Sequence, residues 1–454
     1  MSEKKLNYLL PHPPLIIEGI GKHNEIAKTK NAIHKIFKEI QDYNPDTIVI
    51  VTPHATTYAD YFCISSGEYA YGDFSNFGLP SLKINVKYDS ELANTISSIA
   101  KEISIPAGSL GEVNKNLDHA TLIPIYFLKP KQIVRISISG FSLIDHYKFG
   151  MCIEKAAKKL KRKIVVIASG DMSHKLKNDG PYGIAKEGIK FDNSIKKYIK
   201  MNNVEKIFDM DEKICEKAGE CGLRPITVLI GSMDSNKINS SVINYEKPYG
   251  VGYLTAKFSS TNKSESILKK IIKNNENKII TIRKNENPLV RLARENIESV
   301  LNTKKTIDIP NYISSYYKNE SAGVFVCIKK NNNLRGCVGT IFPTEKNIAS
   351  EVLRNSISAA FYDNRFTQIK KEELNELVYS VDILSTPEKI DNIKLLNPKK
   401  YGIILTQGSN QGVLLPDLED IDTIEKQIEI TAKKGNINLL KPYAIMRFTV
   451  KRVN

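Results

Sequence analysis

Three short runs of β-prone residues constrain the fold most, because each is apolar at consecutive positions. They are Asp46–Val51 (DTIVIV), Ile133–Ile138 (IVRISI) and Ile164–Ala168 (IVVIA). A strand that is apolar on both faces must be covered on both faces, as in a parallel sheet flanked by helices. Segments with helical spacing of apolar residues, Glu25–Asp42 and Lys148–Leu160, alternate with these runs. The alternation predicts an α/β domain with a mainly parallel sheet.

A change in composition divides the chain near residue 260. All seven histidines precede residue 175, and a polar stretch, SSTNKSES, follows Phe258. A length of 454 residues suits two domains. We predict a first domain over residues 1–260, a linker with a short helix and strand over residues 261–286, and a second domain over residues 287–454.

The second domain has a different pattern. Leu289–Leu301 has the spacing of an amphipathic helix, and the β-prone runs Gly323–Ile328 and Leu334–Ile341 flank a turn sequence, KKNNN. This pattern predicts an α+β fold with an antiparallel or mixed sheet. Further helices are expected at Ile348–Ala360 and Thr423–Lys434, and further strands at Tyr379–Leu384, Gly402–Leu405 and Gln411–Leu415.

Charge and cysteine content exclude several classes of protein. The net charge of +16 comes mostly from lysine and is spread over both domains, so we expect no nucleic-acid partner. No stretch approaches the roughly 18 apolar residues of a membrane span, and the first residues lack the apolar core of a signal peptide, so we expect a cytoplasmic protein without membrane contact. Self-association into a homo-oligomer is compatible with this composition. Reduced thiols are expected, without structural zinc, because no CxxC pair occurs among Cys63, Cys152, Cys215, Cys221, Cys327 and Cys337.

Three histidines follow three of the strand-like runs in the first domain. His12, His54 and His174 each come a few residues after such a run. The carboxyl ends of parallel strands meet at one edge of a sheet, where ligands bind. We therefore expect the three histidines to face a common site and not to be separate surface residues.

Histidines in such a cluster can hold a metal ion. Two histidines and one carboxylate bind Fe(II) on one face and leave positions for substrate and dioxygen. Glu220, in AGECGLRPI before a predicted buried helix, is the first carboxylate candidate, although an acidic residue is also favoured at a helix N-terminus by the helix dipole. Cys221 is a rival ligand. Asp171 is a further candidate, or it orients the imidazole of His174.

Five segments of the first domain resemble a known family. LPHPPLI, TPHATTYAD, LDHATLIPIYFL, SGDMSH and GECGLRPI are similar to motifs of the LigB-like class III extradiol ring-cleavage dioxygenases. The resemblance implies that His12, His54 and Glu220 hold Fe(II) or another divalent metal, that His174 is a catalytic acid/base, and that His119 lines the substrate pocket. The segment CGLRP also resembles Memo-like proteins, in which a cysteine contacts the metal. The third ligand is therefore open between Glu220 and Cys221.

The implied reaction is the opening of a small aromatic ring by dioxygen. A catechol or aminophenol can chelate Fe(II) through two atoms, and a histidine near neutral pKa can move the hydroxyl proton. Arg224 is a candidate to pair with a substrate carboxylate through its forked guanidinium, with a surface or capping arginine as the alternative.

The second domain carries one notable segment, LRGCVGT. Gly336 and Gly339 flank Cys337, which predicts a close backbone approach, and Arg335 is placed to lower the thiol pKa. A buried structural cysteine is the alternative. Because no histidine follows residue 174, this domain has no Cys–His pair of its own, which disfavours independent catalysis.

Together with AAFYDNRFTQIKKEEL and GVLLPDLED, the LRGCVGT segment resembles the AMMECR domain family, whose biochemical role is not established. The fusion of the two domains resembles the AmmeMemoRadiSam system protein A family, which implies a radical-SAM partner protein. Two functions follow as hypotheses. One is an Fe(II)-dependent extradiol dioxygenase. The other is a metal-binding or redox accessory protein that serves a radical-SAM enzyme.

Overall fold

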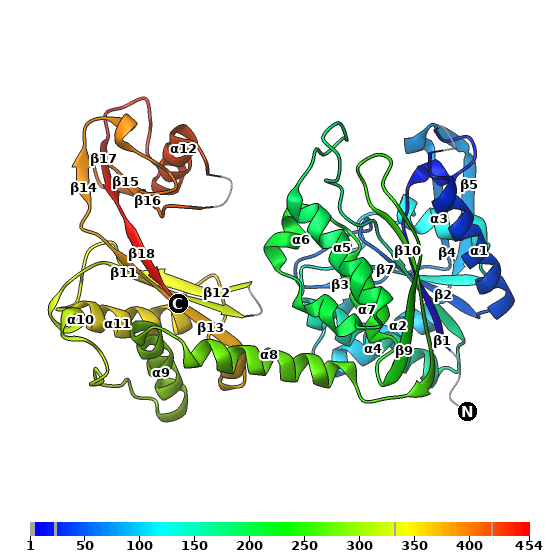
Figure 1. The fold of residues 1–454 in the computed structure, drawn as a ribbon, viewed down its shortest axis with the longest axis horizontal. Coiled ribbons are helices and arrows are strands. Elements are labelled where there is room, and N and C mark those ends of the chain that lie inside the picture. The colour runs from blue at the N-terminus through cyan, green and yellow to red at the C-terminus, as the bar shows by residue number, and fades with distance from the viewer. Residues whose placement is uncertain (1–4, 22–24, 331–332, 419–420) are drawn as a thin grey trace. The chain divides into compact units, whose positions relative to one another are not determined.

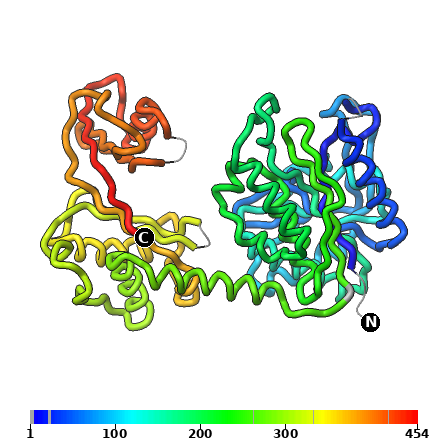
Figure 2. The backbone as a smooth tube through the Cα atoms, in the orientation of Figure 1, coloured from blue at the N-terminus to red at the C-terminus, as the bar shows by residue number. Residues whose placement is uncertain are grey.

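The computed structural model describes residues 5–21, 25–330, 333–418 and 421–454 (Figure 1). The chain divides into two compact units, Met1–Lys273 and Asn274–Asn454, and the path of the backbone through each can be followed in Figure 2. Each unit contains hydrophobic cores of its own. The two units are described separately below.

The first unit is built on one large mixed sheet. Its strands are β1 (Lys5–Leu10), β2 (Thr47–Thr52), β4 (Tyr69–Phe74), β5 (Leu79–Tyr88), β7 (Gln132–Ser137), β8 (Ile164–Ser169), β9 (Asn236–Glu246) and β10 (Tyr253–Lys263). In the described residues their order is β4-β5-β7-β2-β8-β1-β10-β9. The run from β5 to β1 is parallel, and β4, β10 and β9 pair antiparallel at the two edges. The predicted α/β fold is confirmed, with the antiparallel edges as an addition. A small parallel pair, β3 (Phe62–Cys63) and β6 (Ala107–Gly108), lies apart from this sheet.

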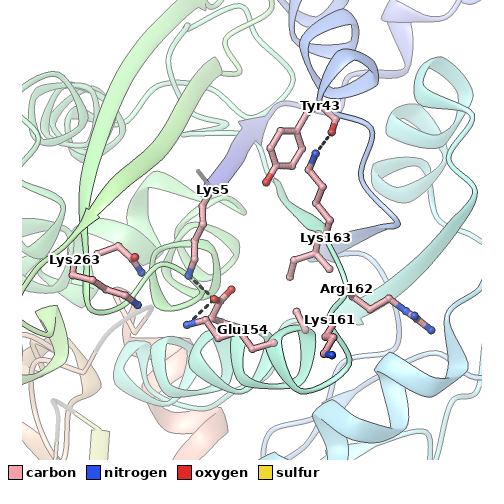
Figure 3. Close-up of a pocket in the computed structure, with 11 residues that line it drawn as sticks. Lys5, Tyr43, Glu154, Lys161, Arg162, Lys163 and Lys263 are labelled. Carbon is pink, nitrogen blue, oxygen red and sulfur yellow. Dashed lines mark hydrogen bonds and ion pairs between the residues drawn. The ribbon is translucent and has the colours of Figure 1, made fainter. Parts of the chain in front are cut away.

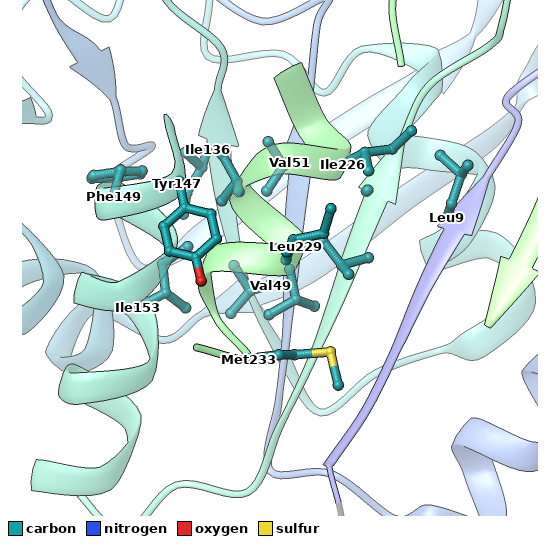
Figure 4. Close-up of a cluster of buried hydrophobic side chains, with 14 of the residues drawn as sticks. Leu9, Val49, Val51, Ile136, Tyr147, Phe149, Ile153, Ile226, Leu229 and Met233 are labelled. Atoms are coloured by element: carbon teal, nitrogen blue, oxygen red, sulfur yellow. The ribbon is translucent and has the colours of Figure 1, made fainter. Parts of the chain in front are cut away.

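Helices cover both faces of this sheet. They are α1 (Ala27–Tyr43), α2 (Ser90–Glu102), α3 (His119–Leu128), α4 (Leu143–Lys159), α5 (Lys186–Lys200), α6 (Glu212–Ala218) and α7 (Leu223–Gly231), with single 3-10 turns at Pro14–Ile16, Ser75–Phe77 and Val204–Asp209. Alternate residues of each central strand enter different cores. Val49 and Val51 of β2 pack in the core under α4 and α7 (Figure 4). Ile48 and Ile50 pack in the core under α1 and α3. This two-sided burial is why these runs are apolar at consecutive positions.

The second unit contains two antiparallel sheets. One has the order β12-β11-β13-β18 and the other β14-β17-β15-β16 in the described residues. The α+β prediction is therefore confirmed. The strands are β11 (Val324–Lys330), β12 (Asn333–Gly339), β13 (Leu377–Leu384), β14 (Glu388–Ile390), β15 (Gly402–Gln407), β16 (Asn410–Leu414), β17 (Ala444–Phe448) and β18 (Val450–Val453). The helices are α9 (Pro288–Thr303), α10 (Ser315–Asn319), α11 (Ile348–Phe361) and α12 (Ile424–Gly435), with 3-10 turns at Lys371–Glu376 and Ile393–Leu395.

The segment expected as a linker forms one continuous helix. Helix α8 (Ile267–Lys284) replaces the short helix and strand that the sequence predicts there. Its last turn belongs to the second unit, because the guanidinium of Arg283 donates to the carbonyl of Leu374 and lies 3.6 Å from the carboxylate of Glu298. Glu286 follows and accepts two hydrogen bonds of 3.1 Å from Nε of Arg294.

Two of the six cysteines are joined, which corrects the expectation of six reduced thiols. Cys327 of β11 and Cys337 of β12 face each other across the hairpin, with their Cα atoms 4.1 Å apart, and form a disulfide. The expectation failed because it considered CxxC spacing only. The two positions are opposite each other in the hairpin that the KKNNN turn predicts, although residues 331–332 of that turn lie outside the described residues.

The helices of the described residues include none that is both long enough and apolar enough to cross a membrane.

A fragment that begins at Asn274 is expected to fold without the first unit. It keeps Arg283 and Glu286, so Arg294, whose side chain is 13% exposed, retains both of its carboxylate partners. A fragment that begins at Pro288 loses Glu286, and we expect its free energy of unfolding to be lower by about 1–3 kcal/mol. Urea unfolding followed by circular dichroism measures the difference.

A chelator is expected to leave both midpoints unchanged, because no histidine is present after residue 174. A midpoint of the longer fragment that depends on metal, or the absence of a cooperative transition, would contradict an independent second unit.

Candidate functional site

The histidines of the first unit meet at the carboxyl edge of its sheet. Strands β2, β8 and β1 are parallel neighbours, so the segments that leave them lie side by side. Nε2 of His12 lies 3.1 Å from Nε2 of His54. The ligand atoms of His12, His54 and His119 all lie within 4.8 Å of one another, a spacing that suits a metal ion. We refer to these three residues and His174 as the histidine cluster.

Ser169, the last residue of β8, determines which nitrogen of His12 is free. The Ser169 hydroxyl donates to the carbonyl of Ala120 at 2.8 Å. A hydroxyl has a single proton, so its oxygen must accept the 3.1 Å hydrogen bond from Nδ1 of His12. Nε2 of His12 therefore carries a lone pair, and this is the atom that faces His54.

Asp118 connects the segments that carry His54 and His119. Its carboxylate caps α3 by accepting the N–H of Thr121 at 3.1 Å, which fixes the first residue of that helix, His119. The same carboxylate accepts the hydroxyl of Thr52 at 2.8 Å. The Thr52 oxygen in turn accepts the backbone N–H of His54 at 3.1 Å. One carboxylate thus orients two histidine-bearing segments.

Arg135 holds the loop that precedes α3. This arginine of β7 is almost fully buried, and its guanidinium lies 2.7 Å from the carboxylate of Glu112. It also donates to the carbonyls of Asn114 and Asn116 and lies 3.7 Å from the carboxylate of Asp118. The buried guanidinium therefore fixes the loop before α3, and with it the position of the Asp118 carboxylate.

Asp171 and Cys221 complete the floor of the site. The Asp171 carboxylate accepts the backbone N–H of His12 at 3.0 Å, and its second oxygen lies 3.9 Å from Nε2 of His12. Sγ of Cys221 lies 3.7 Å from Nε2 of His12 and 3.7 Å from Nε2 of His174. Asp171 therefore contacts His12, whereas the sequence suggested it as a partner of His174.

Two glycines bring Cys221 to this place. A Cβ atom on Gly170 would lie 2.4 Å from Cα of Gly222, so a side chain there would push the two loops apart. The N–H of Asp171 donates to Sγ of Cys221 at 3.2 Å across the same contact. The close approach of the two backbones therefore sets the position of the thiol.

All four histidines of the cluster are neutral at neutral pH. Burial lowers the pKa of His12, His54, His119 and His174, to about 4 for His119. Repulsion between the rings lowers the pKa of His12, His119 and His174 further. Neutral imidazoles retain the lone pairs that a metal ion requires.

Burial has the opposite effect on the acidic groups. It raises the pKa of the Asp171 carboxyl to about 7 and raises the pKa of the Cys221 thiol well above its usual value. A nearby cation would favour the ionised form of both groups, because metal binding displaces protons from its ligands.

Glu220 lies outside the histidine cluster. Its carboxylate accepts the backbone N–H of Leu223 at 2.7 Å, at the start of α7. Burial raises the pKa of Glu220 to about 7, and the Leu223 N–H and the charge of Arg224 offset part of that rise. The structure shows the contact of Glu220 at the helix terminus and brings the neighbouring Cys221 to His12 and His174. Metal binding by Glu220 stays a prediction.

Arg224 lies beside Glu220. Its charge acts on Glu220, Cys215 and His146, and its Nε is buried without a hydrogen-bond partner among the described residues. Contact between Arg224 and a substrate carboxylate stays a prediction.

Aromatic side chains border the cluster. The ring centroid of Phe77 lies 5.4 Å from that of His119. The Tyr182 ring, which is 59% exposed, lies 5.4 Å from the ring of His174. Sequence reasoning missed both, since an aromatic residue in a loop has no distinguishing pattern. It also missed Asp118, for which a signal existed, because an aspartate before an apolar helix predicts an N-cap.

The LRGCVGT segment makes close contacts within the second unit. A Cβ on Gly336 would lie 2.1 Å from the carbonyl oxygen of Ala359, and one on Gly339 would lie 2.2 Å from the ring of Phe325, which confirms the predicted close approach. Arg335 binds Glu373 through two hydrogen bonds of 3.0 Å. With Cys337 in a disulfide, the proposed effect of Arg335 on a free thiol does not apply.

The first unit is thus an α/β protein with a metal-compatible cluster of neutral histidines at the carboxyl edge of its sheet. The chain belongs to the LigB family: the model described as "Catalytic LigB subunit of aromatic ring-opening dioxygenase" matches residues 6–256. The AMMECR1 family model matches residues 290–453. The fusion that the motifs indicate is therefore confirmed.

One of the relatives matches along nearly the whole chain, and others match only part of it. Protein CA_C1420 of Clostridium acetobutylicum is 38% identical over 459 aligned positions, which cover 98% of each chain. A Thermotoga maritima protein is 41% identical over 169 positions, covering 37% of this chain and 97% of its own. The crystal structure of the uncharacterized protein PH0010 from Pyrococcus horikoshii is 30% identical and covers 36% of this chain and 88% of its own, with a TM-score of 0.34.

Replacing Ser169 with Ala should weaken metal binding without removing a ligand. Nδ1 of His12 loses its acceptor, so the ring is no longer fixed with Nε2 toward His54, and we expect metal affinity to fall by about 10- to 100-fold. Competition with a chromophoric chelator measures the affinity.

Ser137→Ala is the matched control. Ser137 is also buried at the carboxyl end of a strand, and its hydroxyl accepts the N–H of Cys63 at 3.2 Å, away from the histidines. Equal losses in the two variants would contradict an orienting role for Ser169.

Proposed function

We propose that the first unit is an Fe(II)-dependent oxidoreductase that opens the ring of a small catechol or aminophenol with dioxygen. The observation that carries this proposal is the approach of the lone-pair atom Nε2 of His12 to Nε2 of His54 at 3.1 Å. Membership in the LigB family supports this proposal, because the family model is described as the catalytic LigB subunit of aromatic ring-opening dioxygenase.

The donor atoms fit a metal ion of this kind. Two neutral nitrogens that face each other at 3.1 Å can share one proton or one cation, and His119 brings a third imidazole within 4.8 Å. Imidazole nitrogens suit iron, zinc and copper. His12 and His54 would hold the ion, with a further ligand from Cys221, His119 or Asp171.

A bound Fe(II) would supply open positions for the two oxygens of a vicinal diol and for dioxygen. The protein supplies the surroundings. Nε2 of His174 lies 3.7 Å from Sγ of Cys221, and as a neutral imidazole it would accept a proton from a substrate hydroxyl. The rings of Phe77 and Tyr182 provide flat apolar surface for an aromatic substrate.

A second function is favoured by the positions of Cys221 and Glu220. A thiol that faces two histidines suits a softer metal site than two histidines with a carboxylate. The corresponding proposal is a metal-binding or redox accessory protein that works with a radical-SAM enzyme. Both proposals share His12 and His54 and differ in whether the loaded protein consumes dioxygen with a substrate.

Oxygen uptake after anaerobic loading with Fe(II) separates the two functions. The dioxygenase proposal expects uptake with at least one member of a panel of catechols and aminophenols, together with a ring-opened product. A fully loaded protein that consumes no oxygen with any member of the panel would favour the accessory function.

Metal content of two variants identifies the third ligand. We expect Cys221→Ser to lower metal affinity by about tenfold or more, while Glu220→Gln, which keeps an acceptor for the Leu223 N–H, leaves it unchanged. Elemental analysis after dialysis against a weak chelator measures both. Loss of metal in Glu220→Gln with retention in Cys221→Ser would establish the carboxylate as ligand.

Replacing His174 with Ala should separate proton transfer from metal binding. We expect metal content near that of the wild type and a turnover reduced by about 100-fold or more, the range for a general acid/base. His34→Ala is the control, because His34 lies on α1 and packs against Phe127. A variant of His174 that loses its metal would identify this histidine as a ligand.

A further inference from the structure

A polar pocket lies at the edge of the sheet opposite to the histidine cluster (Figure 3). Lys5 begins β1, Ile164 begins β8, and Lys263 ends the antiparallel strand β10, so all three mark the amino edge. The pocket has a volume of about 330 Å³. Its position separates it from the histidine cluster, which occupies the carboxyl edge.

Positive charge dominates the lining of this pocket. The lining residues include one carboxylate, Glu154, and six basic side chains among the described residues, namely Lys5, Lys158, Lys161, Arg162, Lys163 and Lys263. These basic residues come from β1, from β10, and from the end of α4 with the turn that follows it. Lys158 lies in the last turn of α4, where a positive charge complements the helix dipole. The dipole does not explain the basic residues that β1 and β10 contribute.

Some of these charges already have partners. Arg162 lies 3.3 Å from the carboxylate of Asp89 and 2.6 Å from that of Glu91. Lys163 donates to the carbonyl of Tyr43 and lies over its ring at 4.0 Å, as Figure 3 shows for the hydrogen bond. Lys163 therefore lines the pocket on the side of α1, whereas Arg162 is held by the carboxylates at the start of α2.

The remaining lysines have too few carboxylate partners to balance their charges. Glu154 is shared by Lys5 at 2.7 Å and Lys158 at 3.0 Å. Within the described ranges, no ion pair of Lys161 or Lys263 is found. The Lys5 side chain is only 16% exposed, and burial, together with the charges of Lys158 and Lys263, lowers its pKa. Three ammonium groups thus repel one another around a single carboxylate.

We propose that this pocket binds a small soluble anion with at least two neighbouring negative charges, of the diphosphate type, between Lys5, Lys158 and Lys263. Such a ligand removes the repulsion among the three ammonium groups, which one carboxylate does not balance. The volume is sufficient for a diphosphate with a small organic group. Asn236 and Tyr43 also line the pocket.

Isothermal titration calorimetry with pyrophosphate tests the proposal on the full chain. We expect one binding site per chain, with an affinity that weakens as salt is added. The double variant Lys158→Gln with Lys263→Gln should bind at least about tenfold more weakly, since both charges act directly on the ligand. Both side chains are exposed, so the fold should not depend on them.

The matched control is Lys159→Gln with Lys269→Gln. It removes the same charge from exposed positions on α4 and α8 that do not line the pocket, and it should change the affinity less than twofold. Equal weakening in the two double variants would overturn the proposal, because it would indicate non-specific attraction to net charge.

Three further outcomes are decisive. Binding that disappears in His12→Ala would place the anion at the histidine cluster and overturn the proposal. Binding to vesicles that contain phosphatidic acid, with no heat from pyrophosphate, would assign the pocket to a lipid headgroup instead of a soluble anion. Absence of binding to either probe would refute an anion site.

Discussion

The parallel pairing of β1 with β8 is the interaction on which the site depends. Its register places Leu10 opposite Ser169, so the residues that follow the two strands lie beside each other. The hydrogen bond from His12 to the Ser169 hydroxyl and that from the His12 N–H to Asp171 both result from this register. A shift of one residue would turn Ser169 to the other face of the sheet and leave the His12 ring without its orienting acceptor.

Much of this arrangement follows from local sequence, because burial on both faces leaves a strong trace. The apolar run at 46–51 becomes β2 at Thr47–Thr52, and the histidines after such runs converge because parallel strands share an edge. Local sequence does not determine whether Glu220 or Cys221 faces His12. The two residues are adjacent in sequence, and which one faces His12 depends on the contact between Gly170 and Gly222, which are 52 residues apart. The role of Ser169 is equally invisible, since a serine that ends a strand has no pattern of its own.

The chain belongs to the LigB family, and a sulfur atom lies among the candidate metal-binding atoms of its first unit. The LigB match covers residues 6–256, most of the first unit, and the atom that approaches both His12 and His174 is a sulfur. A thiolate shifts preference toward softer ions such as zinc or copper(I), whereas an all-nitrogen set with His119 would suit ferrous iron equally well. The choice of donors would therefore decide which ion this site prefers.

The disulfide between Cys327 and Cys337 has a consequence for how the second unit meets other chains. Strand β12 is the outermost strand of its sheet, with β11 as its neighbour there. This edge is partly covered within the chain, because the Cys337 N–H donates to the carboxylate of Asp363 and the Cys337 carbonyl accepts from Arg365. Edge groups that are engaged in this way are a poor template for pairing with another chain. A covalent rung across β11 and β12 holds Cys337 in the register of these contacts, while a bridge between residues only ten positions apart restricts the unfolded chain little. Reduction of the disulfide would release that register, and we expect its loss to appear as association through β12 more than as unfolding of the second unit.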